Sequence, residues 1–275
     1  MNLGVIAQQN NSRAVEVAAE IDAALAEHDV GCQFDPTTAE SLGRSADGKS
    51  LSTFESCALV VSIGGDGTFL FAARAAGETP ILGINLGEVG FLNAVAPDNA
   101  VSTVREEIMS LQAGTHTSRE APRLTAVADD FASVPAVNEL VVGGPRRGHG
   151  GGAQIEVSVN GSSYSAGHAD GVMIATPMGS TAYNLSEGGP IVHPEIDGLV
   201  INEMCAVDGM PPLVVDEDSR IEVTVRHTDH AVVVSDGRQP STLDTPASLT
   251  VSRAETPVRI AGPATDFFEA LDKLS

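Results

Sequence analysis

The chain has 275 residues, which is long enough to bury a core in one large domain or two smaller ones without disulfides or metal. It carries 37 acidic residues and only 15 basic ones, and a net charge of −22 argues against a nucleic-acid-binding surface. No uncharged apolar run approaches the roughly 18 residues of a membrane span, and the N-terminus lacks the pattern of a signal peptide. We therefore expect a cytoplasmic protein that has no membrane partner.

The composition also predicts a halophilic origin. Carboxylates are abundant, lysine occurs only at Lys49 and Lys273, and aromatic residues make up 4% of the chain. Repulsion within so acidic a chain is costly in dilute buffer, whereas about 1 M salt shortens the Debye length to roughly 3 Å and screens it. The alternative is an ordinary acidic protein of a mesophile.

Short apolar runs alternate with helical patterns in the first part of the chain. Three runs predict buried strands, at 3–7, 58–63 and 81–85. Three patterns with apolar residues three or four positions apart predict helices: the first follows an Asn11–Ser12 capping signal, the second follows the sequence GGDGT, and the third is closed by Gly114. This alternation predicts an α/β domain over 1–117 with an open, Rossmann-like, largely parallel sheet.

From about residue 118 the pattern changes to β-branched runs separated by Gly, Pro, Asn and Asp. It predicts an all-β domain over 118–255, a β-sandwich or a folded-over sheet. The expected strands lie in the runs 124–129, 135–142, 153–161, 171–177, 221–227, 231–237 and 248–253. The last segment, 256–275, ends in a helical pattern with Phe267, Leu271 and Leu274 on one face, and we expect it to pack back on the first domain.

The cysteines and histidines give little sign of a metal site. Cys32, Cys57 and Cys205 are widely spaced and odd in number, so we expect small buried apolar residues rather than a disulfide framework or a thiolate site. His227 and His230 have HxxH spacing, but no third ligand lies nearby in the sequence.

The sequence GGDGT (64–68) lies where a predicted strand meets a predicted helix, the position at which open α/β sheets bind ligands. Its glycines allow close approach to a phosphate or ribose, and the helix N-terminus offers free N–H groups. Asp66 distinguishes the loop from GxGxxG and from the P-loop, because a carboxylate repels a bare phosphate unless it bridges Mg²⁺ or acts as a base. The structural alternative is a tight turn in which Asp66 caps the helix.

A second motif extends from Asp170 to Pro190 and combines a carboxylate, hydroxyl side chains, the sequence GSTAY and a Gly-Gly-Pro turn. Together with GGDGT, Asn85-Leu-Gly87-x-x-Gly90-Phe-Leu and Asn138-Glu139, it resembles the NAD kinase family, with the order of all four motifs preserved over about 58–239. The resemblance implies phosphorylation of the 2′-hydroxyl of the adenosine ribose of NAD, with ATP or polyphosphate as donor and Mg²⁺ as the divalent cation.

The resemblance also assigns roles to residues. Asp66 is the implied general base, or it aligns the hydroxyl and Mg²⁺, and Gly67 contacts the dinucleotide beside it. Asn138 and Glu139 hold the adenosine, and Asp170 contacts ribose or amide groups, with His168 at a position where some members carry a basic contact. The stretch that lines the nucleotide pocket comprises Thr181, Ala182, Tyr183, Asn184, Leu185 and Ser186.

Several positions keep two interpretations. Tyr183 stacks on or flanks an adenine ring, or it is a buried tyrosine at a strand end. Cys205 offers its backbone to the ligand or is a core thiol, and either Arg238 or Gln239 faces the nucleotide. No lysine stands in these motifs, so Arg146, Arg147 and His149 are candidates for holding donor phosphates, or they belong to an exposed loop.

Two other functions remain as alternatives: a lipid or sugar kinase that shares a GGDG loop, and a non-catalytic NAD-binding regulatory module. The accompanying Asn-Glu and GSTAY motifs favour the NAD kinase family over the first, and the presence of Asp66 favours it over the second, since a sensor needs no base. The resemblance further implies a homodimer or homotetramer.

Overall fold

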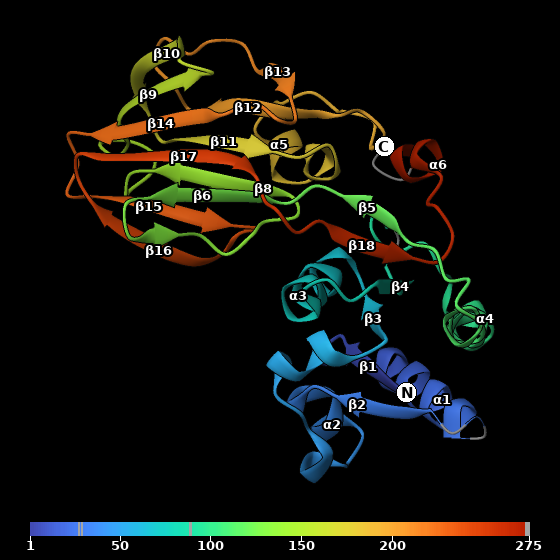
Figure 1. Ribbon diagram of the computed structural model, residues 1–275. Helices are drawn as coiled ribbons and strands as arrows, with labels where there is room; N and C mark the ends of the chain where they lie inside the picture. Colours follow the sequence, from blue (N-terminus) through green and yellow to red (C-terminus); the bar gives the residue numbers. More distant parts are fainter. Residues whose placement is uncertain (27, 29, 88–89, 273–275) are drawn as a thin grey trace. The chain divides into compact units, whose positions relative to one another are not determined.

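The computed structural model describes residues 1–26, 28, 30–87 and 90–272. The chain divides into two compact units. The first consists of residues 1–121 and 256–275, and the second of residues 122–255. The first unit is α/β and the second is rich in strands, so the predicted fold class is confirmed (Figure 1).

A six-stranded sheet forms the centre of the first unit, in the order β2-β1-β3-β4-β18-β5. The four strands β2, β1, β3 and β4 are parallel, β18 is parallel to β4, and β5 is antiparallel to β18. Figure 1 shows red β18 beside green β5, two segments far apart in the chain. The strands are β1 (Asn2–Ala7), β2 (Gly31–Phe34), β3 (Leu59–Gly64), β4 (Ile81–Asn85), β5 (Arg119–Ala121) and β18 (Val258–Ala261).

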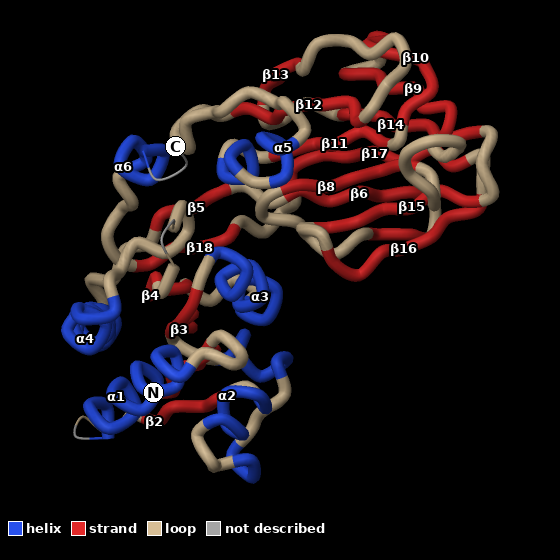
Figure 2. Tube along the Cα trace, turned by 180° about the vertical axis from the view of Figure 1, so that it is seen from behind, coloured by secondary structure: helices blue, strands red, loops and turns tan. Residues whose placement is uncertain are grey.

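Helices cover both faces of this sheet (Figures 1 and 2). On one face, Val17 of α1 and Val104 of α4 share a buried core with apolar residues of β1, β3 and β4, including Val61 of β3. The helix α3 packs on the opposite face. Asn11 caps the first helix with its side chain, and Gly114, in the left-handed conformation, ends the fourth. The helices are α1 (Ser12–Ala26), α2 (Pro36–Ser41), α3 (Asp66–Ala76), α4 (Ala100–Ala113) and α6 (Phe267–Asp272).

The C-terminal segment returns to the first unit through β18 and α6. In α6, Phe267 places its ring 6.0 Å from that of Phe91, centroid to centroid. Leu274, which the helical pattern includes, lies outside the described residues.

The second unit is a sandwich of two antiparallel six-stranded sheets. One has the order β10-β9-β14-β17-β6-β7 and the other β13-β12-β11-β8-β15-β16. Inward residues such as Leu140, Val172 and Val223 share one buried core, as expected for alternation along half-buried strands. The first sheet contains β6 (Leu124–Ala128), β7 (Phe131–Ala132), β9 (Ala153–Val159), β10 (Ser162–Ala169), β14 (Ile221–Arg226) and β17 (Ala247–Arg253).

The second sheet of the sandwich contains β8 (Glu139–Gly143), β11 (Gly171–Ala175), β12 (Gly198–Met204), β13 (Leu213–Asp216), β15 (His230–Ser235) and β16 (Arg238–Asp244). Its outward residues Val141, Met173 and Met204 form a small cluster with Tyr183 packed against it. Tyr183 begins the short helix α5 (Tyr183–Ser186), so the alternative of a tyrosine at a strand end is wrong.

The cysteines differ from expectation at one position. Cys57 is buried and Cys32 is partly buried, but Cys205 is exposed. It directly follows the last residue of β12 and has a φ of 50°, which places it where the chain leaves the sheet. The expectation of a buried thiol is therefore wrong for Cys205.

Candidate active site

In the first unit, the GGDGT sequence forms the junction between β3 and α3. Asp66 is the first residue of the helix, and its carboxylate accepts hydrogen bonds from the backbone N–H of Phe91 (3.3 Å) and of Leu92 (3.2 Å) and from the side-chain amide of Asn93 (3.4 Å). Gly65 occupies the N-cap position without a side-chain cap. The alternative in which Asp66 caps the helix is therefore wrong, because its side chain is turned to the loop after β4.

Burial raises the pKa of the Asp66 carboxyl above its ordinary value, and the hydrogen bonds from Leu92, Phe91 and Asn93 partly oppose that rise. A carboxylate with a raised pKa accepts a proton more readily than one in water. The side chain is therefore held in one orientation and tuned toward the behaviour of a base.

The glycines around Asp66 fall into two kinds. At Gly64 an added Cβ would lie 2.4 Å from Oγ1 of Thr68, so packing within the junction requires glycine. At Gly65 and Gly67 it would meet no atom within 4 Å, and neither residue has a positive φ. The open space beside Gly65 and Gly67 borders the first turn of α3, and the dipole at the N-terminus of a helix attracts phosphate.

In the second unit, Asn138 and Glu139 lie buried where β8 begins. The carboxylate of Asp236, which follows β15, accepts hydrogen bonds from the backbone N–H of Val137 (3.0 Å), Asn138 (2.8 Å) and Glu139 (3.2 Å). The N–H of Asp236 in turn donates to the carbonyl of Glu139 (3.0 Å). The reasoning from sequence missed Asp236 as a functional residue; its one signal was the Ser-Asp-Gly turn after an apolar strand.

Two atoms of this pair have no protein partner. Oδ1 of Asn138 and Oε2 of Glu139 are buried and make no hydrogen bond. Burial and the charge of Asp236 raise the pKa of Glu139 to about 8, opposed by a hydrogen bond from the backbone of Tyr183. Buried polar atoms are rarely left unpaired in folded proteins, so these two indicate a place where a polar ligand completes the site.

The segment after β11 packs directly on Asn138. The hydroxyl of Thr176 donates to the carbonyl of Val137 (2.7 Å), and the N–H of Thr176 donates to the carbonyl of Asn138 (2.9 Å). At Gly179 an added Cβ would lie 2.1 Å from the backbone carbonyl oxygen of Asn138. Because Gly179, the first residue of the GSTAY sequence, has no side chain, this segment can approach the backbone of Asn138 closely.

Tyr183 and Asp170 anchor the glycine-rich loop 146–152. The guanidinium of Arg147 donates to the hydroxyl of Tyr183 (2.9 Å), and the N–H of Gly148 donates to the carboxylate of Asp170 (2.8 Å). A ring nitrogen of His168 lies 2.9 Å from the carbonyl of Gly151. Tyr183, Asp170 and His168 thus all bond to this loop. The Cys205 thiol interacts with Asp170, whose charge raises the pKa of that thiol.

The remaining predicted residues differ in exposure. Asn184 is fully buried and donates to the carbonyls of Ser180 (3.1 Å) and Pro190 (3.0 Å), so its amide holds the turn together. Gln239 has a φ of 49° and lies beside Arg238 in β16. The residues that are partly buried or exposed are Thr181, Ala182, Leu185, Ser186, His149, Arg146, Arg238 and Gln239.

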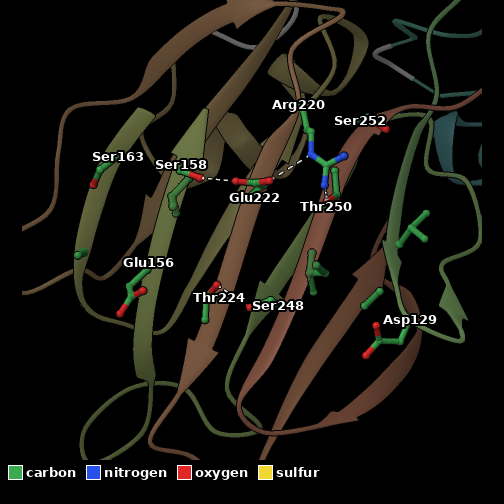
Figure 3. A pocket seen from close by; sticks show the side chains of 15 residues that line it. Asp129, Glu156, Ser158, Ser163, Arg220, Glu222, Thr224, Ser248, Thr250 and Ser252 are labelled. Carbon is green, nitrogen blue, oxygen red and sulfur yellow. Dashed lines mark hydrogen bonds and ion pairs between the residues drawn. The ribbon is translucent and has the colours of Figure 1, made fainter. Parts of the chain in front are cut away.

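A hollow of about 880 Å³ lies elsewhere, on the outer face of the first sandwich sheet (Figure 3). Several of its polar side chains pair with one another: for example, Glu222 accepts from Ser158 (2.9 Å) and from Arg220 (3.2 Å). None of the candidate residues above lines it. The hollow is thus a largely polar sheet face that contains none of the candidate residues.

Among the described residues, no three His, Cys, Asp or Glu side chains are grouped so as to hold a metal ion. Mg²⁺ commonly binds through one or two carboxylates, water and the phosphates of a substrate, so Asp66 fits a cation that arrives with phosphate better than a resident one. Within the described part of the chain, no helix has the length and apolar character to cross a membrane.

Comparison with known proteins matches two parts of the chain to domains of one family. The family model of the ATP-NAD kinase N-terminal domain matches residues 3–110, and that of the ATP-NAD kinase C-terminal domain matches residues 138–262. The NAD kinases of Halorubrum lacusprofundi and Halobacterium salinarum are 54% and 53% identical to this chain, each over the full length of both proteins.

Solved structures share the fold. An NAD kinase from Archaeoglobus fulgidus in complex with ATP has a TM-score of 0.80 at 24% identity and covers all of both chains. A yeast NADH kinase complexed with NADH has a TM-score of 0.84 at 20% identity and covers all of this chain and 87% of its own.

Proposed function

This chain belongs to the NAD kinase family, and we propose that Asp66 is the general base with which it phosphorylates the 2′-hydroxyl of the adenosine ribose of NAD. The chain is thus a phosphotransferase with an alcohol group as acceptor. The observation that supports the role of Asp66 is its carboxylate, oriented by three hydrogen bonds and bordered by open space at Gly65 and Gly67.

The chemistry needs three things from the residues. The hydroxyl must lie in line with the terminal phosphoryl group, its proton must be accepted, and negative charge must be neutralised as the new P–O bond forms and the bond to the departing ADP or shortened polyphosphate breaks. Asp66 accepts the proton, and the N–H groups of the first turn of α3 lie against the phosphates. Asp66 is the carboxylate that would hold Mg²⁺ arriving with the phosphate donor, and the ion would supply further charge neutralisation.

The second unit supplies the binding residues for NAD. Asn138 and Glu139 present their unpaired buried oxygens to the adenosine. Tyr183, whose backbone donates a hydrogen bond to Glu139, connects them to the loop 146–152, to which Asp170 bonds as well. Both units match ATP-NAD kinase domains, which favours this function over a lipid or sugar kinase with a related loop.

The test uses purified protein in multimolar KCl with Mg²⁺ and NAD, with ATP or polyphosphate added separately. An NADP-specific dehydrogenase detects the product. We expect NADP from at least one donor, and the comparison identifies which. Absence of NADP with both donors, while NAD still binds, would instead favour the non-catalytic NAD-binding module.

We also propose that the protein acts in the cytoplasm of a halophile as a homodimer or homotetramer. The acidic composition and the full-length similarity to proteins of Halorubrum and Halobacterium support the halophilic origin. We expect the melting temperature to rise strongly from dilute buffer to multimolar KCl, because salt screens the repulsion among 37 acidic residues. Equal melting temperatures at both salt concentrations would contradict this proposal.

A further inference from the structure

The buried group at the start of β8 contains a carboxylate that the proposed mechanism does not use. Asp236 accepts three backbone hydrogen bonds and returns one, so it joins the end of β15 to residues 137–139. It lies 97 to 99 positions away in the chain from the donors it binds. Its carboxylate therefore fixes the backbone that carries Asn138 and Glu139.

We propose that Asp236 is a positioning residue that holds Asn138 and Glu139 in place and keeps Glu139 in its neutral, protonated form, so that Glu139 donates a hydrogen bond to the adenosine part of NAD. This inference rests on the proposed function. A neutral carboxyl group offers an O–H donor, whereas an ionised one only accepts.

The charges around Glu139 come from three directions. Asp236 brings a negative charge from the end of β15, and the buried Arg123, which precedes β6, brings a positive charge that interacts with Asp236. Tyr183 contributes a backbone N–H to Glu139, and its phenol carries the hydrogen bond from Arg147 and lies near Glu187. The charge of Asp236 thus has the same sign as that of an ionised Glu139, and burial disfavours that ionised form as well.

The unpaired Oε2 of Glu139 makes the neutral form chemically useful. An ionised carboxylate with one oxygen buried and unpaired is disfavoured, whereas a neutral carboxyl group can place its proton toward a ligand acceptor. The neighbouring Oδ1 of Asn138 is buried and unpaired as well. Together the pair offers one donor and acceptors to a ligand such as a nucleoside, which has both kinds of group.

The sign of the pH dependence follows from this arrangement. Because the pKa of Glu139 is raised to about 8, the neutral form prevails at lower pH and is lost as pH rises through that value. If only the neutral form binds NAD, the dissociation constant rises up to about tenfold per pH unit above the pKa. Removing the charge of Asp236 lowers the pKa of Glu139 and shifts this loss of affinity to lower pH.

The experiment measures the dissociation constant of NAD by calorimetry between pH 6 and pH 9.5 in multimolar KCl. The wild type should bind with constant affinity at low pH and lose affinity above about pH 8. Glu139→Gln, which cannot ionise, should bind NAD with no pH dependence in this range. Asp236→Asn should weaken binding roughly tenfold and begin to lose affinity at lower pH than the wild type.

The matched control is Asp244→Asn, which makes the same chemical change on exposed β16 and should follow the wild-type curve. A wild type whose affinity is flat up to pH 9.5 overturns the inference, as does Asp236→Asn with an unshifted curve. If Asp236→Asn does not fold, the comparison of the wild type with Glu139→Gln still decides, because both retain Asp236.

Binding and catalysis separate this inference from the function on which it rests. NADP formation by the wild type, measured on the same preparation, tests the proposed function alone. NADP formation with a flat binding curve contradicts only the role of Glu139, and a wild type that binds no NAD at any pH contradicts both.

Discussion

Asp66 in the first unit and Asp236 in the second accept the same kind of hydrogen bond, but we assign them different roles. Each carboxylate accepts hydrogen bonds from backbone N–H groups of a segment distant in the chain. Asp66 borders open space at Gly65 and Gly67, whereas Asp236 is buried and its own N–H returns a bond to the segment it holds. The surroundings of a carboxylate, rather than the number of bonds it accepts, separate a group poised to react from one that positions others.

The largest expected effect comes from Asp66→Asn, which removes the proposed base and preserves shape. Turnover should fall by about 10² to 10⁴, because a positioned base contributes that much to the rate. The dissociation constant of NAD should change little, since the binding residues of the second unit are untouched. Steady-state rates and calorimetry on the same sample check both expectations, and a variant with more than about a tenth of the wild-type turnover would contradict the role.

Gly179→Ala tests the positioning side of the comparison. The added Cβ would meet the backbone oxygen of Asn138 at 2.1 Å, so one of the two segments must move. Such overpacking costs about 1–3 kcal/mol of unfolding free energy, and the displaced Asn138 should raise the KM for NAD. Denaturant melts and kinetics measure the two effects; unchanged stability and unchanged KM would show that the contact does not hold Asn138.

Gly67→Ala is the matched glycine substitution beside Asp66. It should change the free energy of unfolding less than Gly179→Ala does, and it should raise that free energy rather than lower it. The new Cβ meets no protein atom and lies in a helix, so the free energy of unfolding should rise by about 0.5–1 kcal/mol. Because it occupies the space we assign to the dinucleotide, kcat/KM should nevertheless fall. A variant that is both more stable and fully active would show that this space is unused.

Local patterns predicted the reactive side of the molecule well. The run of apolar residues before GGDGT and the helical pattern after it placed Asp66 at the end of a strand, as β3 and α3 show. The capping signals at Asn11 and Gly114 were confirmed as well. A cap depends only on neighbours within a few positions, so a local pattern is enough to predict it.

Features that depend on distant partners escaped prediction. β16 is a largely polar, exposed strand containing Pro240, and pairing with β15 alone makes it a strand. Asp236 has a function only because β15 pairs with β8 and brings it to Val137, 99 positions away. Cys205 was expected to be buried because the three cysteines show no disulfide or metal pattern, but a residue after the end of β12 faces solvent.

The most direct test measures kcat and the dissociation constant of NAD for Asp66→Asn and Asp236→Asn side by side, with Asp244→Asn as the control. The account predicts that Asp66→Asn loses turnover and keeps NAD, whereas Asp236→Asn loses NAD affinity by a larger factor than it loses turnover. If both variants lost the same quantity to the same extent, the division between a reactive and a positioning aspartate would be contradicted.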